Sequence, residues 1–153
     1  MSTHTASIDV EVPLTTVYDQ WTQFESFPEF MEGVERITQL DDTHTRWTVK
    51  VGPSTREFDA TITEQHPDER VAWTSDDGPQ HAGVITFHRL DDTTTRITAQ
   101  MDIEPDGFAE NVADKLGFVK RRVESDLASF KEFIERRGRE TGAWRGDVQR
   151  PDA

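Results

Sequence analysis

Three ionisable side chains fall on the apolar faces of expected β-strands, where they could do chemistry. Arg56 has the parity of Phe58, and His81 and Arg89 have the parity of Ile85. A guanidinium can stabilise an oxyanion and an imidazole can move a proton, so the three are candidate catalytic residues facing an apolar pocket. All three stand at strand ends, and that position favours the alternative of a solvent-exposed rim.

Other catalytic chemistries lack their residues in this sequence. The chain has no cysteine, which excludes disulfides, thiolate metal ligands and a cysteine nucleophile. The five histidines show no two-histidine helical spacing of the kind that zinc sites use. No nucleophile elbow, P-loop or dinucleotide fingerprint occurs. We therefore expect no metal and no cofactor.

The charge argues against nucleic acid as a partner. The 153 residues carry a formal net charge of −13, whereas phosphate binding needs a basic surface. The charge is uneven, with a net −16 up to residue 114 and +3 from Lys115 onward. No apolar run is long enough to span a membrane, and residues 1–7 lack the apolar segment of a signal peptide. The expectation is a soluble, cytoplasmic protein.

Seven segments alternate apolar and polar residues with the period of a half-buried β-strand. In the third segment, Trp47, Val49 and Val51 share one face. Short turns separate the later six segments, which indicates an antiparallel meander with one buried face. The expected strands are 7–12, 34–40, 43–51, 55–65, 70–75, 81–90 and 93–103.

A long amphipathic helix is predicted over residues 116–137, where apolar residues recur every three or four positions. It has a lead-in at 108–115 and should end near Gly138. Two shorter helices are expected between the first two strands, one after Pro13 and one ending at Gly33. This order of elements predicts an α+β helix-grip fold. In that fold a curved, seven-stranded antiparallel sheet wraps around a long C-terminal helix, and two short helices follow the first strand.

Five segments have a distinctive sequence: 8–13 (Ile-Asp-Val-Glu-Val-Pro), 24–34 (Phe-Glu-Ser-Phe-Pro-Glu-Phe-Met-Glu-Gly-Val), 83–87 (Gly-Val-Ile-Thr-Phe), 95–98 (Thr-Arg-Ile-Thr) and 126–131 (Asp-Leu-Ala-Ser-Phe-Lys). Together they resemble the polyketide cyclase/dehydrase-like proteins of the START-like (Bet v 1-like, SRPBCC) superfamily, which are similar to coenzyme Q-binding START-domain proteins. The resemblance covers about residues 5–138 and implies a single START-like domain over 1–153, with 139–153 as a C-terminal tail. The tail looks like the ending of uncharacterised actinobacterial proteins, and Trp144 should pack back onto the domain.

Members of this superfamily bind hydrophobic ligands between the sheet and the long helix, and the resemblance implies such a cavity here. An apolar site with few polar groups suits a small molecule. The same residues would form an ordinary core if the helix lay closer to the sheet. The residues expected to line the cavity are Phe27, Phe30, Met31, Trp47, Phe58, Ile62, Trp73, Ile85, Phe87, Met101, Val119 and Val123.

Three functions stay open at this point. The resemblance implies binding or transport of a hydrophobic small molecule of polyketide, aromatic or isoprenoid type. The alternative is a polyketide aromatase/cyclase or dehydratase whose substrate, a poly-β-ketone, is bound to an acyl carrier protein. A third is an interaction protein with a vestigial pocket, whose tail makes a homodimer contact. The scarcity of ionisable groups at mid-strand favours binding over catalysis.

Overall fold

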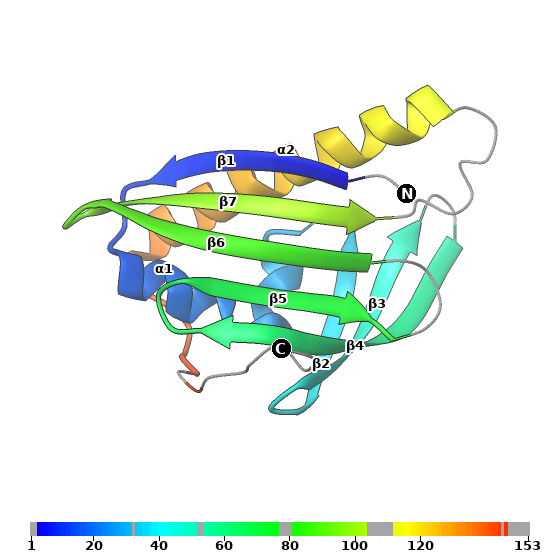
Figure 1. The fold of residues 1–153 in the computed structure, drawn as a ribbon, viewed down its shortest axis with the longest axis horizontal. Coiled ribbons are helices and arrows are strands. Elements are labelled where there is room, and N and C mark those ends of the chain that lie inside the picture. The colour runs from blue at the N-terminus through cyan, green and yellow to red at the C-terminus, as the bar shows by residue number, and fades with distance from the viewer. Residues whose placement is uncertain are drawn as a thin grey trace.

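The computed structural model describes residues 3–31, 33–51, 54–76, 81–103, 112–144 and 146 (Figure 1). The predicted order of elements is confirmed, and the second short helix is a 3₁₀ helix. The elements are β1 (Thr3–Val10), α1 (Leu14–Trp21), η1 (Phe24–Glu29), β2 (Val34–Asp41), β3 (His44–Val51), β4 (Ser54–His66), β5 (Arg70–Ser75), β6 (His81–Asp91), β7 (Thr94–Ile103) and α2 (Val112–Arg137).

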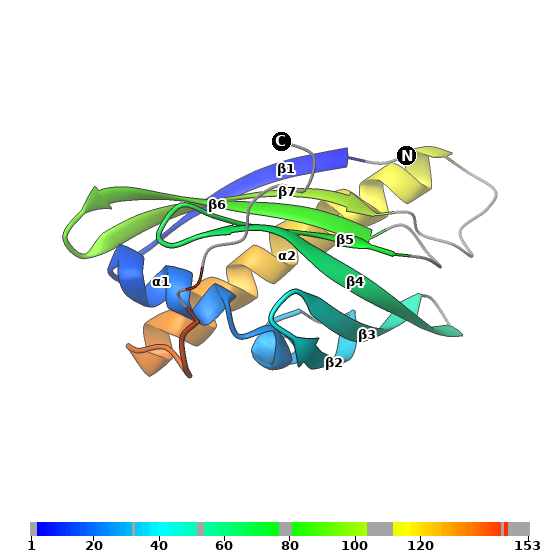
Figure 2. The same ribbon diagram turned by 60° about the horizontal axis from the view of Figure 1, so that its bottom comes forward.

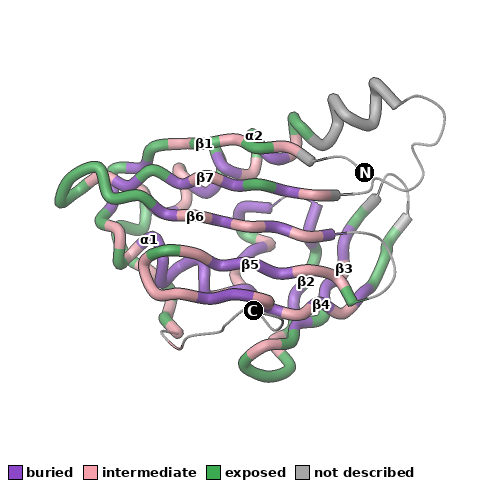
Figure 3. Tube along the Cα trace, viewed as in Figure 1, coloured by how far each residue is buried: buried purple, intermediate pink, exposed green. Residues whose placement is uncertain are grey.

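The strands form one curved antiparallel sheet in the order β1-β7-β6-β5-β4-β3-β2. The helix α2 crosses one face of this sheet, and α1 and η1 lie on the same side (Figure 2). Buried and more exposed residues alternate along the strands (Figure 3). The core therefore lies between the concave face of the sheet and the helices, and the predicted helix-grip fold is confirmed.

Several strand ends differ from the prediction by one residue, and the bounds of β1 and the start of α2 differ by more; β1 ends at Val10 rather than at residue 12. Strand β1 starts at Thr3 because its pairing with β7 continues through polar residues, which carry no apolar alternation. Helix α2 starts at Val112, and residues 108–111 of the expected lead-in lie outside the described residues. The helix ends before Gly138, whose φ is +73° and whose N–H donates to the Ile134 carbonyl (2.8 Å). Glycine adopts this left-handed conformation without a steric penalty.

A β-bulge in β4 turns Gln65 toward the concave face. The register pairs Ile62 with Trp73 and Gln65 with Val71, so three steps along β4 match two along β5. The extra residue reverses the alternation of side chains beyond Ile62. Gln65, which a regular strand would place on the outer face, is therefore 1% exposed and part of the interior.

Side chains of the helices form hydrogen bonds with backbone groups of both edge strands, β1 and β2. On the β1 side, Lys131 of α2 donates from Nζ to the carbonyl oxygen of Asp9 (3.0 Å). On the β2 side, Glu25 of η1 accepts a hydrogen bond at Oε2 from the N–H of Gln39 (2.9 Å). These contacts fasten the helices to the two ends of the sheet, at the margins of the concave face that they cover.

Candidate functional site

An aromatic cluster of Trp47, Phe58, Trp73 and His81 packs on the concave face. Trp47 stacks on Phe58, with ring centroids 5.8 Å apart, and on Trp73, with centroids 5.6 Å apart. The His81 ring centroid lies 4.8 Å from that of Trp47. Gly83 is opposite Trp73 and makes room for its ring, because a Cβ at Gly83 would lie 2.6 Å from Trp73 Cζ2. The cluster thus joins side chains from β3, β4, β5 and the first residue of β6.

His81 is buried inside this cluster rather than exposed at a rim, so the rim interpretation is wrong for this residue. Trp73 donates from Nε1 to His81 Nδ1 (3.3 Å), and the His81 N–H donates to Ser75 Oγ (3.1 Å). The first bond places the ring proton on Nε2. Burial lowers the pKa of His81 from 6.5 to about 4, because the imidazolium would lose its hydration. The ring is therefore neutral at physiological pH.

The structure does not bring the three candidate catalytic residues together. Arg56 and Arg89 are both exposed. Arg89 forms an ion pair with Asp92 at the turn after β6. It stands at the opposite end of β6 from His81, about 26 Å away at roughly 3.3 Å per residue. Arg89 therefore supplies no donor beside the buried imidazole, and Arg56 is exposed near the start of β4.

A small apolar hollow lies between the sheet and α2. Its volume is about 20 Å³, which is room for a single water molecule. Trp21 forms part of the wall, and its Nε1–H is buried without a hydrogen-bond partner in the part of the chain that the structure describes. The other lining residues are Met31, Ile85, Ala99, Met101, Val123, Asp126 and Leu127. The lining is thus mostly apolar, with Asp126 as the one acidic residue among those described, and it includes Trp21 with its unpaired donor.

Of the twelve residues expected to line a cavity, eleven are buried, and the side chain of Val119 lies outside the described residues. Those that line the hollow are Met31, Ile85, Met101 and Val123. Ile62 lines a second cavity, and the others pack in the core. The prediction omitted Trp21, although its helical spacing from Val17 and Tyr18 marked it as facing inward.

Comparison with known proteins agrees with this architecture. The family described as "Polyketide cyclase / dehydrase and lipid transport" matches residues 10–132. An uncharacterised 17.2 kDa protein from the melC2-rnhH intergenic region of Streptomyces lincolnensis is 60% identical over 149 residues, which are 97% of this chain and 99% of that protein. A START superfamily protein from Mycobacterium smegmatis is 13% identical, with a TM-score of 0.67 over 90% of this chain and 97% of that one. The Zhui aromatase/cyclase from Streptomyces sp. R1128 is 18% identical, with a TM-score of 0.69 over 93% and 98%.

A curved antiparallel sheet that grips a C-terminal helix over an apolar hollow defines a START-like protein, and the two solved structures share this fold. The family match and the Streptomyces lincolnensis relative define the family further. The chain belongs to the polyketide cyclase/dehydrase and lipid transport family. Among the described residues, no helix is both long and apolar enough to cross a membrane.

Proposed function

We propose that the protein binds a hydrophobic small molecule between the sheet and α2. The observation that carries this proposal is the mostly apolar hollow, whose lining includes Trp21, a residue with a buried and unpaired Nε1–H among the described residues. A buried donor without an acceptor is costly, and a ligand oxygen would satisfy it. The preferred ligand is therefore an apolar molecule with at least one carbonyl or hydroxyl oxygen, which polyketides, aromatic phenols and quinones all provide.

Ligand binding at this site requires the hollow to expand. Small-molecule pockets have volumes of roughly 300–1,000 Å³, whereas this hollow has about 20 Å³. Met31, which follows η1, and Met101, on β7, both line it. Methionine is unbranched and adapts its rotamers more readily than other apolar residues. We expect these two side chains to move when the ligand enters.

Filling the hollow tests the proposal. Val123→Trp adds bulk where the ligand would lie, and Val123→Met is a milder version that is safer for folding. Nile red is a suitable probe because it is uncharged, apolar and carries a carbonyl oxygen. We expect Val123→Trp to weaken Nile red binding at least about tenfold, which corresponds to a loss of roughly 1.4 kcal/mol of binding free energy. The measurement is a fluorescence titration, with thermal unfolding as the check on folding.

Leu90→Trp is the matched control, since Leu90 is 45% exposed near the end of β6 and does not line the hollow. It should leave the affinity for Nile red unchanged. Trp21→Phe removes the donor and keeps an aromatic ring, so it should weaken binding several-fold. Equal affinities in Val123→Trp, Trp21→Phe and the original protein would rule out this site.

A catalytic role is the second candidate, and His81 is the observation that favours it. Its neutral imidazole is held in one tautomer on the concave face, as an acid–base group would be. A pKa of about 4 makes it a weak base, which is why binding is the first proposal. A cyclase or dehydratase would lose turnover of a carrier-bound poly-β-ketone in His81→Gln but keep its affinity for the substrate. Unchanged turnover in that variant would remove His81 from the mechanism.

A further inference from the structure

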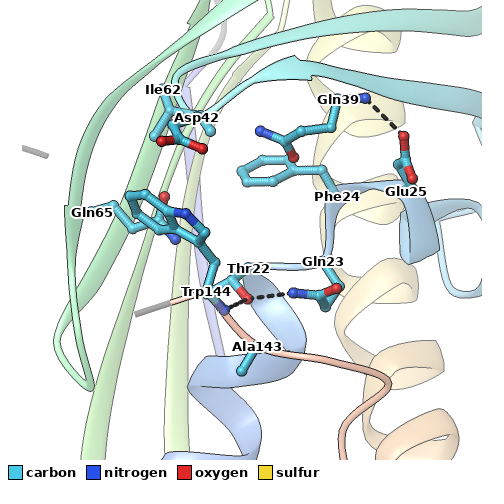
Figure 4. A pocket seen from close by; sticks show the side chains of 10 residues that line it. All are labelled: Thr22, Gln23, Phe24, Glu25, Gln39, Asp42, Ile62, Gln65, Ala143 and Trp144. Carbon is cyan, nitrogen blue, oxygen red and sulfur yellow. Dashed lines mark hydrogen bonds between the residues drawn. The ribbon is translucent and has the colours of Figure 1, made fainter. Parts of the chain in front are cut away.

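A second cavity lies at the junction of α1 and η1, outside the hollow under α2. Its volume is about 280 Å³, and residues from α1–η1, β2, β4 and the C-terminal tail line it (Figure 4). Phe24 and Ile62 supply apolar surface, and Trp144 reaches the same space from the tail. The cavity is about the size of a compound of one or two fused rings.

The tail is built onto this cavity by specific hydrogen bonds. The Thr141 N–H donates to Gln20 Oε1 (2.8 Å), and Gln20 Nε2 donates to Thr141 Oγ1 (3.2 Å). The Trp144 N–H donates to Thr22 Oγ1 (3.1 Å). Gln20 and Thr22 are both buried, so two interior polar side chains of the α1 region hold the tail in place. Trp144 is therefore a fixed part of the wall.

Gln65 gives the cavity an unused hydrogen-bond donor. It lines the cavity and is 1% exposed, and its Nε2 has no hydrogen-bond partner in the part of the chain that the structure describes. The bulge in β4 is what turns this side chain inward. A buried amide N–H without an acceptor destabilises the protein unless a ligand accepts from it.

The charge at the cavity disfavours anions. Glu25 and Asp42 both line it and are exposed, and they bring two carboxylates to the same space. A ring placed beside Phe24 and Trp144 would gain aromatic contacts. We propose that this cavity is a second binding site for a flat, uncharged compound of one or two fused rings whose carbonyl oxygen accepts a hydrogen bond from Gln65 Nε2.

Coumarin is a probe that matches this description, and naphthalene is the matched probe without an oxygen. Binding is followed by nitrogen-15 NMR, using the Trp144 indole and the Gln65 side-chain amide as reporters. Coumarin should shift both signals in a saturable way. Gln65→Met keeps the side-chain length and should weaken coumarin binding about tenfold, as the loss of one ordinary hydrogen bond does. Naphthalene binding should stay within about twofold, because it makes no such bond.

Two further variants complete the test. Trp144→Ala should weaken the binding of both probes, and Gln100→Met, an exposed change on β7, should weaken neither. Val123→Trp should leave coumarin binding intact, which separates this site from the hollow under α2. Coumarin shifts confined to residues around Val123, or equal coumarin affinities in the original protein, Gln65→Met and Trp144→Ala, would overturn the proposal.

Discussion

Burial of the His81 ring links the stability of the protein to pH. The pKa of this residue is about 4 in the folded chain and returns to about 6.5 on unfolding. Between these values the unfolded chain binds a proton that the folded chain does not, so stability falls as the pH falls from about 6.5 to 4. The total loss is on the order of 3 kcal/mol.

His81→Gln should remove this pH dependence, because glutamine keeps an acceptor for Trp73 but does not titrate. Urea unfolding at about pH 7, 6 and 5 measures it as a free energy of unfolding. His88→Gln, an exposed change on the same strand, is the control and should behave like the original protein. The Arg96 hydrogen bond lowers the pKa of Asp9 below 3.8, so this carboxyl group titrates below the pH range of the measurement. If the free energy of unfolding changed with pH equally in His81→Gln and in the original protein, the prediction would be contradicted.

Gly83 should tolerate no side chain while Trp73 lies over it. In Gly83→Ala the new Cβ would lie 2.6 Å from Trp73 Cζ2 and 2.8 Å from Met101 Sδ. Forcing these groups apart should cost about 1–3 kcal/mol of stability, the usual penalty of overpacking. Thermal unfolding measures the loss. A smaller ring should relieve the clash, so adding Trp73→Phe to Gly83→Ala should cost less than the sum of the single changes.

At the scale of elements, the sequence predicts those helix and strand boundaries that depend on residues close together in the chain. The bounds of β5 (Arg70–Ser75) and the end of α2 before Gly138 agree with the prediction, because alternation, turns and a glycine cap are visible in the sequence. The bulge that buries Gln65 depends on the pairing of β4 with β5, which no single segment reveals. The burial of His81 likewise depends on Trp73 of β5 and Trp47 of β3, which contact it only in the folded sheet. The hydrogen bonds between Gln20 and Thr141 join residues 121 positions apart, so no local sequence pattern could predict them.

Removal of the tail after Gly138 should destabilise the domain. Gln20 would lose both of its hydrogen bonds to Thr141, and Thr22 would lose its bond from Trp144. The expected loss in the free energy of unfolding is about 1–3 kcal/mol, measured by urea titration. Thr141→Ala removes only the hydroxyl and should cost about 1 kcal/mol or less. A truncated chain as stable as the full chain would show that the hydrogen bonds of the tail contribute nothing to stability.

The molecule as a whole carries more negative charge than its ion pairs offset. The net charge is −13, and exposed pairs such as Arg96 with Asp9 and Arg46 with Asp59 contribute little to stability. Salt screens the repulsion among the remaining carboxylates. We therefore expect the melting temperature to rise by several degrees between about 0.05 and 1 M sodium chloride. An osmotically matched glucose series is the uncharged control, and a melting temperature that falls with salt would contradict the prediction.

The hydrogen bonds of Lys131 to β1 and of Glu25 to β2 also limit how copies of this protein can associate. A carbonyl of β1 already receives Lys131, and an amide of β2 already donates to Glu25. Open strands invite other chains to extend a sheet, which is a common route to aggregation. With these groups engaged, a strand added along β1 at Asp9 or along β2 at Gln39 would have to displace a helix side chain.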